Sequence, residues 1–370
     1  MRRFAILFGI ATILLYPMCA LADISFGGSA RSDAMGGAGI AIVDRSDRNN
    51  ILNPASLALM NRRVTMAFPS IGFHASGIPI GKAFDHIFGN PNASDAAGLA
   101  KDFGGNPSDF GVDINLGLRL GHMDIQGTGS AKVYVDPNPA LEAWSKNGNG
   151  NTTLLLTDPV YKNSQADIIG AAVYSLPSVG MAERISPKGS PTRVELGARM
   201  KLMTAYYTHY IMSAASIASN GPAVPASELN GNTNIHNTGF GMDLGLLVHP
   251  SNHEGISGAV VITDAIAPHF TFNGTDATGQ PYKYDLQPSS ATIGTAYENG
   301  RVLLAADLVD ITHGYGPTQE RVGGEYRTKR IALRMGYASP AGFTFGFGVL
   351  GLDLAFGARS PIVVSELLHF

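Results

Sequence analysis

The sequence predicts an all-β protein, a transmembrane antiparallel β-barrel of about 14 strands. Three observations predict this fold. Apolar and polar residues alternate through many segments of about ten residues, enough for a tilted strand to cross a bilayer. The first residues read as an export signal, and the last residue is the aromatic Phe370.

The clearest alternation runs through residues 110–120, where every even position is apolar and the odd positions carry glycine, Asp, Asn or Arg. A period of two places these sets on opposite faces of a strand. The pattern returns in residues 194–202, 240–249, 331–337 and 343–349. The alternative is a soluble β-sandwich, whose second face would be richer in Thr, Lys and Ser. Glycine weakens an ordinary strand but suits a crowded barrel wall, so we favour the barrel.

The two faces of these strands have different expected environments. A basic residue on the lipid face near the midplane costs roughly 2–4 kcal/mol. We therefore expect the apolar set to face lipid, for example Leu196, Met200, Leu244 and Leu333. The charged set is expected to face the lumen: Glu195, Arg199, Lys201, Asp243, Asp307, Glu325, Arg327 and Arg334. We favour a salt-bridge network that holds the N-terminal segment, residues 23–62, to the wall over direct ligand contacts for these charges.

The chain begins with the features of a secretory signal. Two arginines precede an apolar run over residues 4–18, and Ala20, Leu21 and Ala22 fit a signal-peptidase site. We expect residues 1–22 to be removed after Ala22. The only cysteine, Cys19, lies in this segment, so the mature chain cannot depend on disulfides.

Composition and motifs exclude several other classes. No later segment has 18 consecutive apolar residues, which argues against an α-helical membrane protein. The net charge of −3 gives no basic footprint for nucleic acid. Histidines 209, 249, 269 and 313 are scattered, and no G-x-S-x-G elbow occurs, so we expect no enzyme. No His/Asp cluster has metal-ligand spacing, and we expect no metal or cofactor.

Residues 23–62 do not alternate and are rich in glycine and alanine. We therefore expect them to lie outside the wall, with residues 63–370 forming the barrel and a first strand from Val64 to about Ala75. Short helices are expected after Pro54 and after the N-cap Asn138. Residues 214–238 and 273–287 are expected to be long polar connections, opposite tight turns such as Asn299-Gly300, an asymmetry typical of outer-membrane barrels.

The residues after the signal contain the patterns R-x-x-x-M-G-G-A and N-P-A. They resemble the N-terminal region shared by FadL-like fatty acid transporters, PorV-like outer-membrane proteins and, closest in pattern, the TraF-like conjugal transfer family. The matching residues are Arg31, Met35, Gly36, Gly37, Ala38, Asn53, Pro54 and Ala55. Later segments also resemble this superfamily, and residues 80–165 resemble it least. The resemblance implies that residues 23–62 form an N-terminal hatch or plug in the lumen and that the matching residues gate it; an ordinary flexible N-terminal segment is the alternative.

The resemblance implies a Gram-negative outer-membrane barrel that binds or passes small hydrophobic molecules across the outer membrane. The alternative is a structural component of a conjugation or secretion apparatus. The charged lumen face departs from the apolar tunnel that a fatty acid needs, so the ligand stays open. Expected partners are outer-membrane lipid, a hydrophobic ligand and the barrel assembly machinery, which would read Phe370. A gate must open at low cost, so we expect few polar contacts rather than a large apolar patch to hold the hatch.

Overall fold

The computed structural model describes thirteen segments of the chain: residues 29–43, 52–59, 64–76, 96–105, 107–148, 150–219, 235–252, 254–275, 280–314, 316–339, 342–350, 352–357 and 362–369. The expected signal peptide, its cleavage site after Ala22, and Phe370 lie outside these ranges. The signal peptide, its cleavage and the recognition of Phe370 by the assembly machinery therefore stay predictions.

Fourteen strands of the described residues form one closed antiparallel sheet. They are β1 (Val64–Ser76), β2 (Ser108–Leu120), β3 (Met123–Pro137), β4 (Gln165–Arg184), β5 (Thr192–Ser213), β6 (Ile235–Pro250), β7 (Gly255–Ile266), β10 (Ser290–Asn299), β11 (Val302–Val309), β12 (Gln319–Arg327), β13 (Ile331–Ala338), β14 (Gly342–Val349), β15 (Leu352–Gly357) and β16 (Ile362–His369). The first strand closes the ring, because Met66 of β1 lies opposite Leu118 of β2 and Leu368 of β16. The predicted barrel of about 14 strands is confirmed.

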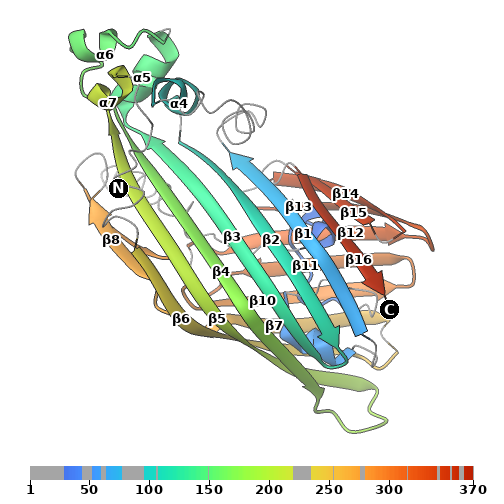
Figure 1. Cartoon of the computed structure of the whole chain (residues 1–370). Helices are drawn as coiled ribbons and strands as arrows, with labels where there is room; N and C mark the ends of the chain where they lie inside the picture. The colour runs from blue at the N-terminus through green and yellow to red at the C-terminus, as the bar shows by residue number, and fades with distance from the viewer. Residues whose placement is uncertain are drawn as a thin grey trace, which may run out of the picture.

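The connections between strands are unequal at the two ends of the barrel. At one end, Gly121 and His122 suffice to join β2 to β3. At the other end lies a helical cap, seen above the long strands in Figure 1. Its helices are α4 (Ala96–Phe103), α5 (Pro139–Asn147), α6 (Leu154–Thr157) and α7 (Ala214–Ala218). Helix α5 begins as predicted, because the Asn138 side chain accepts a hydrogen bond from the Leu141 N–H at 3.0 Å.

The two faces of the wall have opposite chemistry. On β13, Leu333 is 58% exposed whereas its neighbour Arg334 is 8% exposed. The same contrast separates Leu196 and Met200 from Glu195 and Arg199 on β5. An apolar exterior around a polar interior is the construction of a transmembrane barrel, and the alternation in the sequence encodes it.

An aromatic row crosses the outer face of three neighbouring strands. Tyr174 stacks on Tyr206 with ring centroids 5.9 Å apart, and Tyr206 stacks on His236 at 5.8 Å. Amphipathic rings favour the membrane–water interface. Beyond this row, β3, β4 and β5 continue to the cap, where Leu141 and Trp144 are buried against the upper ends of these strands.

Two expected polar connections differ from the prediction. Strand β6 already begins at Ile235, inside the range 214–238. Residues 273–287 belong largely to a second sheet, a hairpin of β8 (Thr271–Thr275) and β9 (Pro281–Asp285). The polar composition of this range concealed the hairpin, because its buried apolar side chains lie at Phe270, Phe272 and Leu286, on the margins of the range.

Two short N-terminal helices pack against the wall from inside the ring of strands. Helix α2 (Ala30–Ala34) contacts β13, β14, β15 and β16, and the 3-10 helix η1 (Pro54–Leu59) contacts β4, β5 and β6. The short helix predicted after Pro54 is therefore confirmed in position. Within the described ranges, no helix combines the length and apolar character needed to cross a membrane.

Candidate functional site

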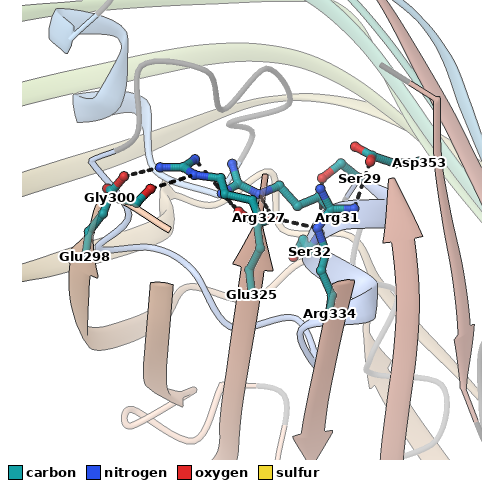
Figure 2. A network of polar contacts seen from close by, with 9 residues as sticks. All are labelled: Ser29, Arg31, Ser32, Glu298, Gly300, Glu325, Arg327, Arg334 and Asp353. Carbon is teal, nitrogen blue, oxygen red and sulfur yellow. Dashed lines mark hydrogen bonds and ion pairs between the residues drawn. The ribbon is translucent and has the colours of Figure 1, made fainter. Parts of the chain in front are cut away.

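A cluster of charged side chains joins helix α2 to the wall (Figure 2). Arg31 donates two hydrogen bonds to Glu325 of β12, with Nε to Oε2 and Nη2 to Oε1 both 2.9 Å. This forked geometry matches guanidinium to carboxylate and is among the strongest side-chain pairings. The side chains are 8% and 1% exposed, so the pair lies almost fully out of water.

Glu325 also forms ion pairs with arginines of the wall. Arg334 of β13 donates from Nε to Glu325 Oε2 at 2.6 Å and from Nη1 to Asp353 Oδ1 of β15 at 2.7 Å. Arg327 approaches Glu325 Oε1 at 3.8 Å and pairs with Glu298 of β10. Glu325 therefore lies among three arginines, and the network ties α2 to strands on both sides of β12.

The glycine-rich turn after α2 binds a second carboxylate. Asp307 of β11 accepts hydrogen bonds from the N–H groups of Gly39 at 2.7 Å and Ile40 at 3.2 Å. Gly36 and Gly37 have φ values of +70° and +77°, a conformation that side chains other than glycine rarely adopt. Their place in the M-G-G motif thus has a conformational reason: they turn the chain from α2 toward Asp307.

Asn53 connects the two halves of the N-terminal segment. Its Nδ2 donates to the carbonyl of Ile40 at 2.9 Å and, at 3.4 Å, to that of Leu246 on β6. Its Oδ1 accepts from the N–H of Ala55 at 2.9 Å, which closes the turn at Pro54. Asn53 is fully buried, so one amide fixes the turn, the preceding segment and the wall.

Glycines of the wall let the backbone of the N-terminal segment approach closely. A Cβ atom on Gly197 of β5 would lie 2.3 Å from the Pro54 carbonyl carbon, and one on Gly245 of β6 would lie 2.2 Å from Asn53 Oδ1. Across the lumen, a Cβ on Gly336 would lie 2.2 Å from the Met35 carbonyl carbon. The glycines that alternate with apolar residues along these strands are therefore docking positions for the N-terminal segment.

The charges opposite α2 pair within the wall. Lys201 Nζ lies 2.7 Å from both Asp243 Oδ1 and Asp264 Oδ1. Arg199 donates from Nη2 to Asp124 Oδ2 at 3.0 Å. Glu195 Oε1 contacts Arg184 Nε at 3.0 Å and His249 Nε2 at 3.4 Å.

The partners Asp124, Asp264, Glu298 and Asp353 were not among the expected lumen charges. Strand alternation could have placed them on the inner face. It could not have paired them with particular bases, because each pair joins different strands.

The N-terminal segment is held by more than polar contacts. Its residues Met35, Ala38, Ile40–Val43, Ala55 and Leu59 form one buried cluster with inward side chains of the wall, including Leu247, Val261 and Leu303. The expectation of few polar contacts and no large apolar patch is therefore wrong. The clustered residues are apolar, and the turn-rich sequence did not reveal that they pack together.

The upper inner wall of β3, β4 and β5 is apolar, which the sequence analysis did not anticipate. This patch, called here the inner-wall patch, consists of Tyr134, Ile169, Ala171, Val173, Met203, Ala205 and Tyr207. Cross-strand register makes it continuous, since Ala171 lies opposite Tyr207 and Val173 lies opposite Ala205. Inward apolar side chains were expected to be scarce; besides those that pack against the N-terminal segment, a second group lies on β3, β4 and β5, at the end nearer the cap.

The predicted site residues fall into separate groups. Arg31, Met35, Gly36 and Gly37 dock on β12–β15 and neighbouring strands, whereas Asn53, Pro54 and Ala55 dock on β5 and β6. The expected lumen charges all lie on the inner face. A cavity of about 500 Å³ lies elsewhere, between the cap and the rim, and is lined by residues such as Asn138, Lys162 and Gln165. Among described residues, no group of three or more His, Cys, Asp or Glu is arranged to hold a metal.

A closed transmembrane barrel with an N-terminal segment docked on its inner wall is the class of protein that these features define. A family model described as "F plasmid transfer operon, TraF, protein" matches residues 109–308, more than half of the chain. The chain belongs to this TraF family. The match confirms the predicted resemblance, although it includes much of the range judged least similar and lies outside the N-terminal motifs.

Three solved structures with similar folds are distant from this chain in sequence. The toluene transporter TodX of Pseudomonas putida has a TM-score of 0.42 at 14% identity, over 93% of this chain and 96% of that chain. The CymD monoaromatic hydrocarbon channel has a TM-score of 0.32 at 13% identity, over the same shares. Outer membrane phospholipase A from Escherichia coli has a TM-score of 0.27 at 9% identity, over 83% and 96%. No curated protein sequence gives a significant match.

Proposed function

We propose that this protein is a bacterial outer-membrane barrel through which small, uncharged apolar molecules pass, with residues 23–62 as its hatch. Three features support a location in the outer membrane. They are the apolar exterior, the charged part of the lumen away from the cap, and the long connections at one end. The hatch supports a closed resting state, because it docks on opposite sides of the lumen through Arg31 and Asn53.

The inner-wall patch is the observation that carries the proposal. A passage for apolar compounds needs an apolar inner surface, and the inner-wall patch would supply one where Phe270, Phe272 and Leu286 now cover it. The patch lies on the same inner face as Lys201, Arg199 and Glu195, nearer the cap. Once the patch is uncovered, a compound that enters from the cap end would meet apolar wall before it met the charges and the hatch.

The test compares Asn53→Ala with Asn299→Ala in the full-length protein. Asn53 fixes the hatch turn to Ile40 and Leu246, whereas Asn299 lies exposed beside a β-turn. In proteoliposomes, Asn53→Ala should increase the flux of naphthalene, while Asn299→Ala leaves it unchanged. Both variants should keep the heat-modifiable gel mobility of a folded barrel. Absence of naphthalene flux in the wild type and both variants would contradict the proposal and favour a role in assembling a conjugation or secretion apparatus.

A further inference from the structure

The β8–β9 hairpin is separate from the barrel wall. It connects β7 to β10, and its strands form a two-stranded sheet in which Phe272 lies opposite Tyr284. An isolated two-stranded hairpin is at best marginally stable in water. Its position therefore depends on the surface against which it packs.

That surface is the inner-wall patch. Phe270, Phe272 and Leu286 of the hairpin segment are each 1% exposed and pack into the same cluster as the patch. The Phe272 ring stacks on Tyr207 with centroids 4.8 Å apart and an angle of 14° between the rings. A phenyl ring from the hairpin thus covers an aromatic face of the lumen.

The hairpin reaches this position by crossing strand β6 at a glycine. A Cβ on Gly239 would lie 2.7 Å from Pro268 Cβ, closer than real side chains come. Gly239 lies opposite Met203 of the patch, so the crossing is on the inner face. The absence of a side chain at this position allows the connection to lie over the wall.

At each border of the patch, an ionisable side chain of β5 pairs with acidic neighbours. Along β5 the inward positions run from Lys201 through the patch to His209. Lys201 contacts Asp243 and Asp264, and His209 Nε2 lies 2.9 Å from Asp167 Oδ1. The surface between these pairs is apolar and aromatic, which favours an uncharged occupant.

We propose that the inner-wall patch is a binding site for an uncharged, flat apolar molecule with rings of phenyl size, and that the β8–β9 hairpin is its lid. In the closed state Phe272 occupies the place of the ligand ring on Tyr207. The ligand competes for the same apolar surface, so the hairpin lifts when it binds. This inference rests on the proposed function, because the compound must first reach the lumen.

The first test uses a disulfide across the crossing point, in G239C/P268C with Cys19→Ser. Disulfides need Cβ atoms about 3.5–4.5 Å apart. The Cβ atoms at positions 239 and 268 would lie 2.7 Å apart, so a small movement of the connection away from β6 suffices. Saturating naphthalene should slow oxidation of the two introduced thiols about fivefold, because a lifted lid separates them. Sorbitol, a polar probe, should have no effect. An oxidation rate unaffected by naphthalene overturns the lid.

The second test removes the ring that covers the patch. An apolar cavity of phenyl size binds benzene-like molecules, so Phe272→Ala should bind fluorobenzene about tenfold more tightly than the wild type, measured by ¹⁹F NMR in nanodiscs. The control is Phe343→Ala, which removes a ring that is 61% exposed on the outer face and should leave the affinity unchanged. Equal affinity in Phe272→Ala and Phe343→Ala overturns the binding site.

These readouts are separable from the proposed function. If naphthalene crosses wild-type proteoliposomes but neither oxidation nor fluorobenzene binding changes, transport stands and the lid and site are wrong. If oxidation is slowed and Phe272→Ala binds more tightly without any flux, the site stands and transport is wrong. With both correct, the oxidised double variant should pass naphthalene about tenfold more slowly, and dithiothreitol should restore the flux.

Discussion

At the scale of single residues, Glu325 has the most connected position in the lumen. It accepts hydrogen bonds from Arg31 of helix α2 and from Arg334 of the wall, and it is 3% exposed. A buried ion pair is not necessarily stabilising relative to an apolar pair, but loss of one partner leaves an uncompensated charge. The network therefore makes undocking of α2 unfavourable.

Glu325→Gln should release helix α2 while the barrel stays assembled. Removal of one partner of a buried pair costs about 3–5 kcal/mol, so hydrogen exchange of residues 30–37 should become faster by at least an order of magnitude. The control is Glu142→Gln, which breaks an exposed pair with Lys146 on α5 and should change exchange little. Unchanged exchange of α2 in Glu325→Gln would show that the apolar cluster alone holds the helix.

Asp33 should make docking of α2 sensitive to pH. Burial raises the pKa of Asp33 from its usual 3.8 to about 7; repulsion by Asp113 adds to the increase and Arg321 opposes it. Between about pH 4 and pH 7, Asp33 is therefore protonated when helix α2 is docked and ionised when the helix is undocked. Docking weakens as the pH rises through this window and is constant above it.

Exchange of α2, corrected for its intrinsic pH dependence, should be slower at pH 5 than at pH 8. Asp33→Asn should remove this difference, because the amide does not titrate. Asp158→Asn, a change on the helical cap, should preserve it. An equal pH dependence in wild type and Asp33→Asn would assign the effect to another group.

At the scale of elements, glycine positions on the strands decide where the N-terminal segment can lie. Gly197 and Gly245 face Pro54 and Asn53, and Gly336 faces Met35. Each strand contributes alternating outward side chains for lipid and small inward positions for docking. The low β-propensity of glycine is therefore offset by contacts that only a bare backbone permits.

Gly197→Ala should displace η1 without opening the barrel. Its Cβ would lie 2.3 Å from the Pro54 carbonyl carbon, and overpacking of this kind costs about 1–3 kcal/mol. Limited proteolysis of residues 52–59 should become faster. Gly258→Ala is the matched control, since its Cβ would meet only the Gly294 carbonyl oxygen, at 3.9 Å. Equal proteolysis in the two variants would contradict the docking role of Gly197.

At the scale of the whole molecule, the barrel is uneven around its circumference. Strands β3 to β6 have 15 to 22 residues, whereas β10 to β16 have 6 to 10. The long side carries the helical cap and the inner-wall patch, and the short side holds α2 (Figure 1). The apolar belt on the outside is common to both sides.

Leu333→Arg should impair assembly of the barrel. Leu333 is 58% exposed near the middle of β13, and an arginine at the lipid midplane costs roughly 2–4 kcal/mol. The folded fraction after refolding into lipid vesicles should fall, measured by heat-modifiable gel mobility. Leu350→Arg, in a turn where the side chain is 83% exposed, should fold as the wild type does. Equal yields would contradict a lipid environment for β13.

The sequence by itself determined the fold class, the two faces of the strands with clear alternation and the start of the first strand at Val64. It also located the N-terminal segment that does not alternate and the N-cap at Asn138. These features follow from local periodicity and from side chains that bond their own neighbours, so a short window of sequence contains them.

Only the tertiary structure decided which charge pairs with which and where the apolar lumen lies. Arg31 and Glu325 are 294 residues apart, and no periodicity specifies that partner. The inner-wall patch combines residues from three strands, and its cover comes from the hairpin connecting two others. Alternation shows that a residue faces inward but does not show which inward residues it contacts. Those contacts are fixed only when β1 pairs with β16 and closes the ring.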